Sequence, residues 1–172
     1  MPIDVKKQLD ELLALADGKA ERLGKHVPKS EDIALVVLKG HLVVEEMLFD
    51  IASTHCRDIV ELRHARLSFA QLLHVTRALS KFPGHEHLWE SIGLLNSLRN
   101  ALVHNLEPGE VERKIAALDK LCELKGEKLR PNYVKPTEPA HIVAASIHFI
   151  IGSLSVLGPV TAFVENNLRL PG

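Results

Sequence analysis

The sequence predicts an all-α protein, a single helical bundle of five to six helices that spans residues 1–172 as one domain. Two observations lead to this prediction. Apolar residues recur at the helical period in almost every segment, and no stretch of useful length alternates polar and apolar residues as a strand would. In addition, 172 residues with 46% hydrophobic and 25% charged residues are typical of one folded domain with its own core.

The first helix is predicted within residues 1–24. Its leucines recur at helical spacing, which places them on one face, and Gly24 ends the pattern. Charged residues separate the apolar ones, so the segment has no core of a signal peptide.

The second helix is predicted over roughly 31–54, with Ser30 as its N-cap. Its residues are apolar over most of the circumference, so we expect it to lie at the centre of the bundle. Three polar residues interrupt this apolar surface: His41, Glu45 and Glu46.

Three further helices are predicted in the middle of the chain. The third begins near Ser68, runs to about residue 79 and ends at the breaker KFPGH. The fourth covers about 86–105 and stops before Pro108, and the fifth covers about 110–125.

A Pro-rich, charged connector is predicted at 126–140, followed by an apolar helix at 141–168. Residues 142–164 contain no charged side chain, and this length of apolar sequence can span a membrane. The stretch also contains several polar residues and a predicted break at Gly158–Pro159, and no Lys or Arg cluster flanks it. We therefore favour a core or dimer-interface helix over a membrane helix, and expect no membrane partner.

The charge and cysteine content restrict the possible functions and compartments. The net charge is −1, whereas a dedicated nucleic-acid binder has a basic excess, so any RNA site must be local. Cys56 and Cys122 are too few for a disulfide framework and lack metal-ligand spacing. We expect a cytoplasmic protein without a metal or another cofactor.

The sequence LNSLRNALVHNLEP, residues 95–108, contains the candidate site. Arg99, Asn100 and His104 place a cation, an amide and an imidazole within about one and a half helical turns. On a helical wheel, Asn96 joins Asn100 and His104 in one polar ridge, while Arg99 lies at the edge of the apolar arc. Arg99 and His104 are then about 140° apart, so one helix alone does not direct both at one small substrate.

A purely structural explanation of these residues is also open. His104 in the last turn would be stabilised by the negative end of the helix dipole. Arg99 beside apolar residues would need a carboxylate, which Glu45 or Glu46 of the second helix could supply.

The fourth helix, LWESIGLLNSLRNALVHN, resembles the HEPN superfamily of all-helical nucleotide-binding and ribonuclease domains. The signature of that superfamily is an Arg, a polar residue, a few further positions and a His near the end of a late helix. Arg99, Asn100 and His104 match this order. The segments LVVLKGHLVVEEMLFDIA and LSFAQLLHVTRALSKFPG look like the preceding helices of uncharacterised bacterial members and of the related mannitol-operon-repressor group.

This resemblance implies a HEPN-like up-and-down core and a homodimer in which both motifs face one cleft. It further implies a metal-independent endoribonuclease, such as a toxin or defence effector with a cognate antitoxin, acting on RNA and not on DNA. Arg99 would hold the scissile phosphate, His104 would transfer the proton of a ribose 2′-OH or of the leaving oxygen, and Asn100 would orient one of these groups. The alternative is a non-catalytic HEPN-like regulator, or a module that binds a protein or nucleotide.

Other residue groups carry weaker signals. His85 and His87 are two positions apart without a third ligand nearby, so we predict no metal site. His41 and Glu45 are one turn apart, which is more typical of a satisfied buried pair than of a catalytic dyad. Glu45 could orient Arg99 if its face of the second helix meets the fourth helix, and Asn96 lies on the same polar ridge as Asn100. We predict both only as supporting residues of the Arg99 site.

Overall fold

A computed structural model describes residues 5–80, 85–104, 109–126 and 136–167. These residues are almost entirely helical and contain no strand, which confirms the all-α prediction. Seven helices occur in them, where five to six were predicted. The helices are α1 (Val5–Gly24), α2 (Ile33–Thr54), α3 (Ile59–His64), α4 (Phe69–Leu79), α5 (Glu86–His104), α6 (Glu110–Gly126) and α7 (Pro139–Asn167).

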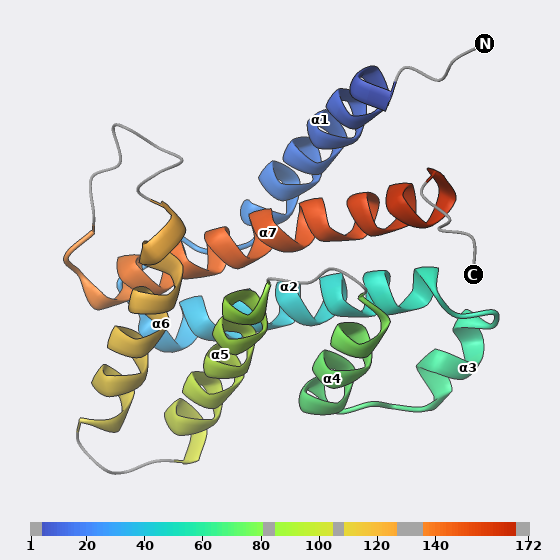
Figure 1. Ribbon diagram of the computed structural model, residues 1–172. Coiled ribbons are helices and arrows are strands. Elements are labelled where there is room, and N and C mark those ends of the chain that lie inside the picture. The colour runs from blue at the N-terminus through green and yellow to red at the C-terminus, as the bar shows by residue number, and fades with distance from the viewer. Residues whose placement is uncertain (1–4, 81–84, 105–108, 127–135, 168–172) are drawn as a thin grey trace.

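The two longest helices, α2 and α7, pack against each other and form the middle of the molecule (Figure 1). The helix α1 packs on α7 and projects beyond the body (Figure 1). The helices α5 and α6 form a pair, and α4 packs between α2 and α5. This arrangement brings one side of α5 against α2, which is the contact that positions the candidate site.

The core is built from the apolar faces of α2, α5 and α7, as their patterns predict. The fully buried side chains include Leu48 of α2, Leu95 of α5 and Ile150 of α7. Burying a side chain of this size stabilises the fold by about 1.5–3 kcal/mol. Hydrophobic residues therefore fix which face of each helix points inward.

The short helix α3 was not predicted. Its six residues contain no buried position, so they cannot show a helical period of apolar residues. A local signal starts the helix instead, since the Asp58 carboxylate accepts hydrogen bonds from the backbone N–H groups of Val60 and Glu61. A second Arg and His pair, Arg57 and His64, is seven positions apart, whereas Arg99 and His104 are five apart, and it lies at α3 and not on a core helix.

One predicted helix boundary and one predicted break within a helix are wrong. The N-cap of α2 is Asp32 and not Ser30, because the Asp32 carboxylate accepts the Leu35 N–H at 3.1 Å, while Ser30 Oγ accepts the N–H of Asp32. The helix α7 also continues through Gly158 and Pro159, where a break was predicted. A proline inside a helix costs about 3 kcal/mol, and burial of nearby core residues such as Leu154 and Leu157 offsets this cost.

The helix α7 is long and apolar enough, over Pro139–Val160, to cross a membrane by composition alone. In this fold half of that stretch is buried inside the protein, where it packs against α1, α2 and α6. A core helix of a bundle has the same composition, because it is surrounded by other apolar side chains. The packing agrees with a soluble bundle.

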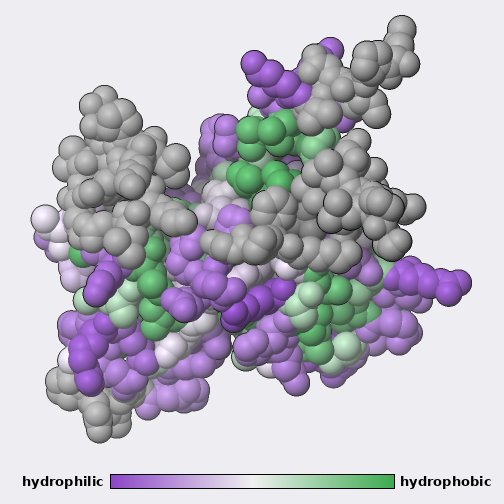
Figure 2. Space-filling model, viewed as in Figure 1, coloured by the Kyte–Doolittle hydropathy of each residue, from purple (hydrophilic) through white to green (hydrophobic). Residues whose placement is uncertain are grey.

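In Figure 2 hydrophilic residues cover much of the coloured surface, and apolar areas include one at the upper middle over α1 and one at the lower right near α4. Some predicted features lie outside the described residues: most of the KFPGH breaker, the turn before Gly109 and most of the 126–140 connector.

Candidate functional site

The helix α5 carries the predicted motif on its last turns and remains α-helical up to His104. Its buried face contains Leu88, Ile92, Leu95 and Leu98, which hold the helix against the core. Arg99 is half-buried at the edge of this face, whereas Asn100 and His104 are exposed. Because the helix is regular, the angle of about 140° between Arg99 and His104 persists. The structure does not bring these two side chains together within one protomer.

The Arg99 guanidinium forms a hydrogen bond with its neighbour in the sequence. Its Nη1 donates to Oδ1 of Asn100 at 3.1 Å. The Nε atom is buried and has no hydrogen-bond partner in the described part of the protein. Neither Glu45 nor Glu46 forms an ion pair with it there. Among the described residues, the structure therefore shows no carboxylate at ion-pair distance, which a structural arginine was expected to have.

His41 of α2 approaches the same side of α5. Its Nε2 lies 3.1 Å from Oδ1 of Asn96, and its ring stacks on Phe69 with 4.0 Å between the ring centroids. Burial lowers the pKa of His41 below its ordinary value near 6.5, and the charge of Arg99 lowers it further. The hydrogen bond with Asn96 and the charge of Glu45 raise this pKa, but burial has the largest effect. The neutral imidazole is therefore favoured at neutral pH, and it must donate to Asn96 through Nε2–H.

We refer to His41, Glu45, Asn96, Arg99 and Asn100 as the α2–α5 polar cluster. The hydrogen bonds and charge interactions above connect its members, which lie at the edge of the core where α2 meets α5. Both predicted supporting residues, Glu45 and Asn96, belong to it. His41 was not predicted as a site residue, although its place on an apolar helix one turn before Glu45 was the available signal.

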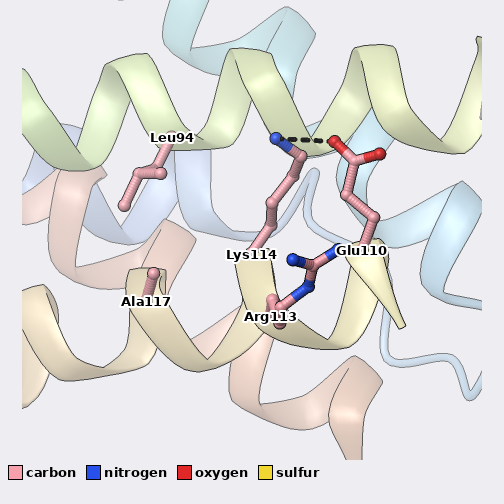
Figure 3. A pocket seen from close by; sticks show the side chains of 5 residues that line it. All are labelled: Leu94, Glu110, Arg113, Lys114 and Ala117. Atoms are coloured by element: carbon pink, nitrogen blue, oxygen red, sulfur yellow. Dashed lines mark ion pairs between the residues drawn. The ribbon is translucent and has the colours of Figure 1, made fainter.

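A shallow depression of about 250 Å³ lies between α5 and α6, and Arg99 is not among the residues that line it (Figure 3). Its polar groups already have partners: Lys114 Nζ lies 3.1 Å from Glu110 Oε1 and donates to Ser97 Oγ at 2.7 Å. Arg113 Nε donates to the carbonyl oxygen of Gly109 at 3.0 Å. These satisfied charges stabilise the α5–α6 pair, and we assign no ligand to the depression.

The remaining reactive side chains do not form a second centre. Cys122 is buried beside Ser91 and Ser146, and burial raises the pKa of its thiol, which disfavours the reactive thiolate. The rings of His85 and His87 lie 6.3 Å apart. Within the described ranges, no three His, Cys, Asp or Glu side chains are grouped as metal ligands would be.

Comparison of the chain with protein-family models, curated proteins and solved structures gives no match. The chemistry of the α2–α5 polar cluster and of His104 must therefore be judged from their geometry.

Proposed function

We propose that the protein is a metal-independent endoribonuclease of the HEPN type, acting as a cytoplasmic homodimer in the manner of a toxin or defence effector. The observation that carries this proposal is the state of Arg99. Its guanidinium has no ion-paired carboxylate among the described residues and keeps one buried N–H unused. No ion pair among the described residues neutralises this charge, and a guanidinium fits two phosphate oxygens at once.

The exposure of His104 supports its role in proton transfer. The imidazole lies at the exposed end of α5, where a ribose 2′-OH or a leaving oxygen can reach it. The 2′-oxygen would attack the phosphorus as His104 takes its proton, and the bond to the 5′-oxygen would break as that oxygen takes a proton from water and leaves as a hydroxyl. The products are a 2′,3′-cyclic phosphate and a 5′-hydroxyl end. Arg99 would stabilise the negative charge that grows on the phosphate oxygens.

A second protomer would solve the geometric problem of the motif, because Arg99 and His104 point in different directions on α5. Val103, which lies between them in the sequence, is 59% exposed. An exposed valine beside the motif is suited to a contact with another copy of this helix. Each composite site would then take Arg99 from one protomer and His104 from its partner.

The test is cleavage of a mixed-sequence RNA by the purified protein in the presence of EDTA. We expect Arg99→Ala and His104→Ala each to reduce the rate by at least about 100-fold, the lower range for loss of an acid–base group or of charge stabilisation. The exposed residues Arg22 and His74 provide matched controls, and Arg22→Ala and His74→Ala should retain the wild-type rate. Equal rates for the wild type and both motif variants would contradict the proposal.

Mixing the two inactive variants tests the composite site. A heterodimer of Arg99→Ala and His104→Ala has one site with both residues changed and one site with neither changed. An equimolar mixture that exchanges subunits should therefore regain about a quarter of the wild-type activity, as the symmetry of a dimer requires. If both residues act within one protomer, mixing restores nothing.

The second candidate is a non-catalytic regulator or a binding module that recognises a protein or nucleotide. The net charge of −1 favours it, as does the position of Arg99 beside the buried pair of His41 and Asn96. In that case Arg99 mainly supports the contact between α2 and α5. Its removal should then destabilise the fold, whereas the loss of a substrate-binding guanidinium should leave stability nearly unchanged.

A further inference from the structure

A groove of about 420 Å³ lies where α2, α3 and α4 meet. Its floor is apolar, and the proposed ribonuclease mechanism does not use it. Only Glu45 belongs both to the lining of the groove and to the α2–α5 polar cluster. The apolar residues of the floor are Leu42, Phe49, Leu62, Leu67 and Leu72.

An exposed row of leucines on α2 leads into this groove. Leu35, Leu38 and Leu42 are 39%, 45% and 50% exposed and recur at the spacing of one helical face. Single exposed leucines are ordinary, but a row that continues into an apolar groove forms one extended surface. Amphipathic helices bind such surfaces through apolar residues at the same spacing.

The charges beside the floor have opposite signs on its two sides. Glu45 and Glu46 come from α2, whereas Arg63 lies on α3 and Arg66 follows it. No ion pair joins these acidic and basic residues in the described structure. Arg63 instead lies over the ring of Phe49, with 5.4 Å between its Cζ and the ring centroid. An elongated ligand with charges of opposite sign along its two edges would complement this groove.

Arg66 gives an independent reason to assign a role to the basic side. Its φ of 46° is in the left-handed region, which glycine or asparagine adopts at lower cost after a helix. The strained backbone places a cation beside the groove, and strain of this kind is typical of positions with a function.

We propose that this groove binds an amphipathic helix of another protein. The apolar face of the bound helix would place residues at positions i, i+3 and i+7 on the leucine row and on the floor of the groove. The edge of the bound helix that faces Glu45 and Glu46 of α2 would be basic. The edge that faces Arg63 and Arg66 would be acidic.

Two synthetic helical peptides test this proposal. Both carry leucines at i, i+3 and i+7. One has lysines on the edge that faces α2 and glutamates on the other edge, and the second peptide has these edges exchanged. Fluorescence anisotropy of labelled peptides measures their binding to the full chain. We expect the first peptide to bind about tenfold more tightly than the second at low salt, as several exposed ion pairs together allow.

Variants of exposed residues locate the binding surface. Leu42→Asp should weaken binding of the matched peptide at least about tenfold, because it places a charge on the apolar floor. Leu15→Asp is the control, since Leu15 is a 69% exposed leucine on α1. A double exchange, Glu46→Arg with Arg63→Glu, should reduce the preference between the two peptides. Circular dichroism of each variant reports whether it folds.

Equal binding of both peptides, no binding of either, or binding unchanged by Leu42→Asp would overturn the proposal. If Leu42→Asp turns a dimer into a monomer, the groove holds a second copy of this chain, and the proposal is also wrong. The assay contains no RNA, so its outcome is independent of the proposed ribonuclease activity.

Discussion

At the scale of single residues, Arg99 separates a catalytic from a structural explanation of the motif. A buried donor without a partner lowers stability by about 1–3 kcal/mol, and the Nε of Arg99 is such a donor among the residues that the structure describes. The neighbouring His41 is hydrogen-bonded to Asn96, and its ring stacks on Phe69, so both contacts stabilise the fold. The polar cluster thus contains one hydrogen-bonded pair and one cation that has no ion-paired carboxylate among the described residues.

This difference predicts that two substitutions in the cluster change the free energy of unfolding by different amounts. Arg99→Ala should change the free energy of unfolding by less than about 1 kcal/mol, because it removes an unsatisfied group along with its packing. Asn96→Ala should lower it by about 1–3 kcal/mol, because it leaves the buried His41 without its partner. Urea denaturation measures both values. A larger loss for Arg99→Ala than for Asn96→Ala would favour the non-catalytic regulator.

His41 should make stability depend on pH. Because burial lowers its pKa in the folded protein, the unfolded chain binds a proton first as the pH falls through its ordinary value near 6.5. The stability that comes from neutral His41 is fully present above this pH and is lost as the pH falls towards the lowered folded pKa. His41→Gln removes this dependence.

The stability advantage of the wild type over His41→Gln should therefore shrink between about pH 8 and about pH 5. Urea denaturation across this range measures it, with the exposed His74→Gln as the control. An advantage that grows on acidification would show that the folded protein binds the proton more readily.

At the scale of elements, local signals decide where helices begin. The helix α4 starts with a reciprocal capping box in which Ser68 and Gln71 bond to each other's backbone N–H groups. The helix α3 has no buried residue and depends on its cap, Asp58. Two nearby polar residues, Ser30 and Asp32, could each cap α2. The hydrogen bond from the Leu35 N–H to the Asp32 carboxylate makes Asp32 the N-cap.

The cap of α2 provides a direct test. Asp32→Ala should lower the free energy of unfolding by about 1 kcal/mol, because it removes the acceptor for the Leu35 N–H and a negative charge at the positive end of the helix. Ser30→Ala should cost less than half as much, since Ser30 bonds only to the N–H of Asp32. Thermal unfolding of both variants is the measurement, and the reverse order would identify Ser30 as the cap.

At the scale of the whole molecule, the close contact between α2 and α7 holds the bundle together. Gly40 lies at this contact, where a Cβ atom would overlap the side chain of Ile147. Ile147 is fully buried and has little space to move. A glycine is therefore required within α2, although glycine costs about 0.5–1 kcal/mol relative to alanine inside a helix.

Two alanine substitutions test this contact. Gly40→Ala should destabilise the protein by about 1–3 kcal/mol, because the overlap outweighs the gain in helix propensity. Gly93→Ala on α5 is the matched control, since a Cβ there meets no atom within 4 Å. It should be neutral or stabilise by up to about 1 kcal/mol. Chemical denaturation separates the two outcomes, and equal effects would show that α2 and α7 are not in close contact at Gly40.

The sequence alone determined the helical class, the approximate extent of six helices and the placement of Arg99, Asn100 and His104 on one of them. These features follow from local periodicity and from helix breakers, which act over a few residues. It did not reveal α3, because a helix without a buried face leaves no apolar period. It predicted a helix at 141–168 but also a break at Gly158–Pro159, which α7 does not have, because burial in the core offsets the local cost of the proline.

Only the tertiary structure decided how the polar residues pair. His41 bonds to Asn96, which is 55 positions away, and no local pattern encodes a contact of that separation. The same packing places Glu45 near this pair yet leaves Arg99 without an ion-paired carboxylate among the described residues. Side-chain pairing depends on how α2 lies across α5, and that crossing results from the burial of apolar faces throughout the bundle.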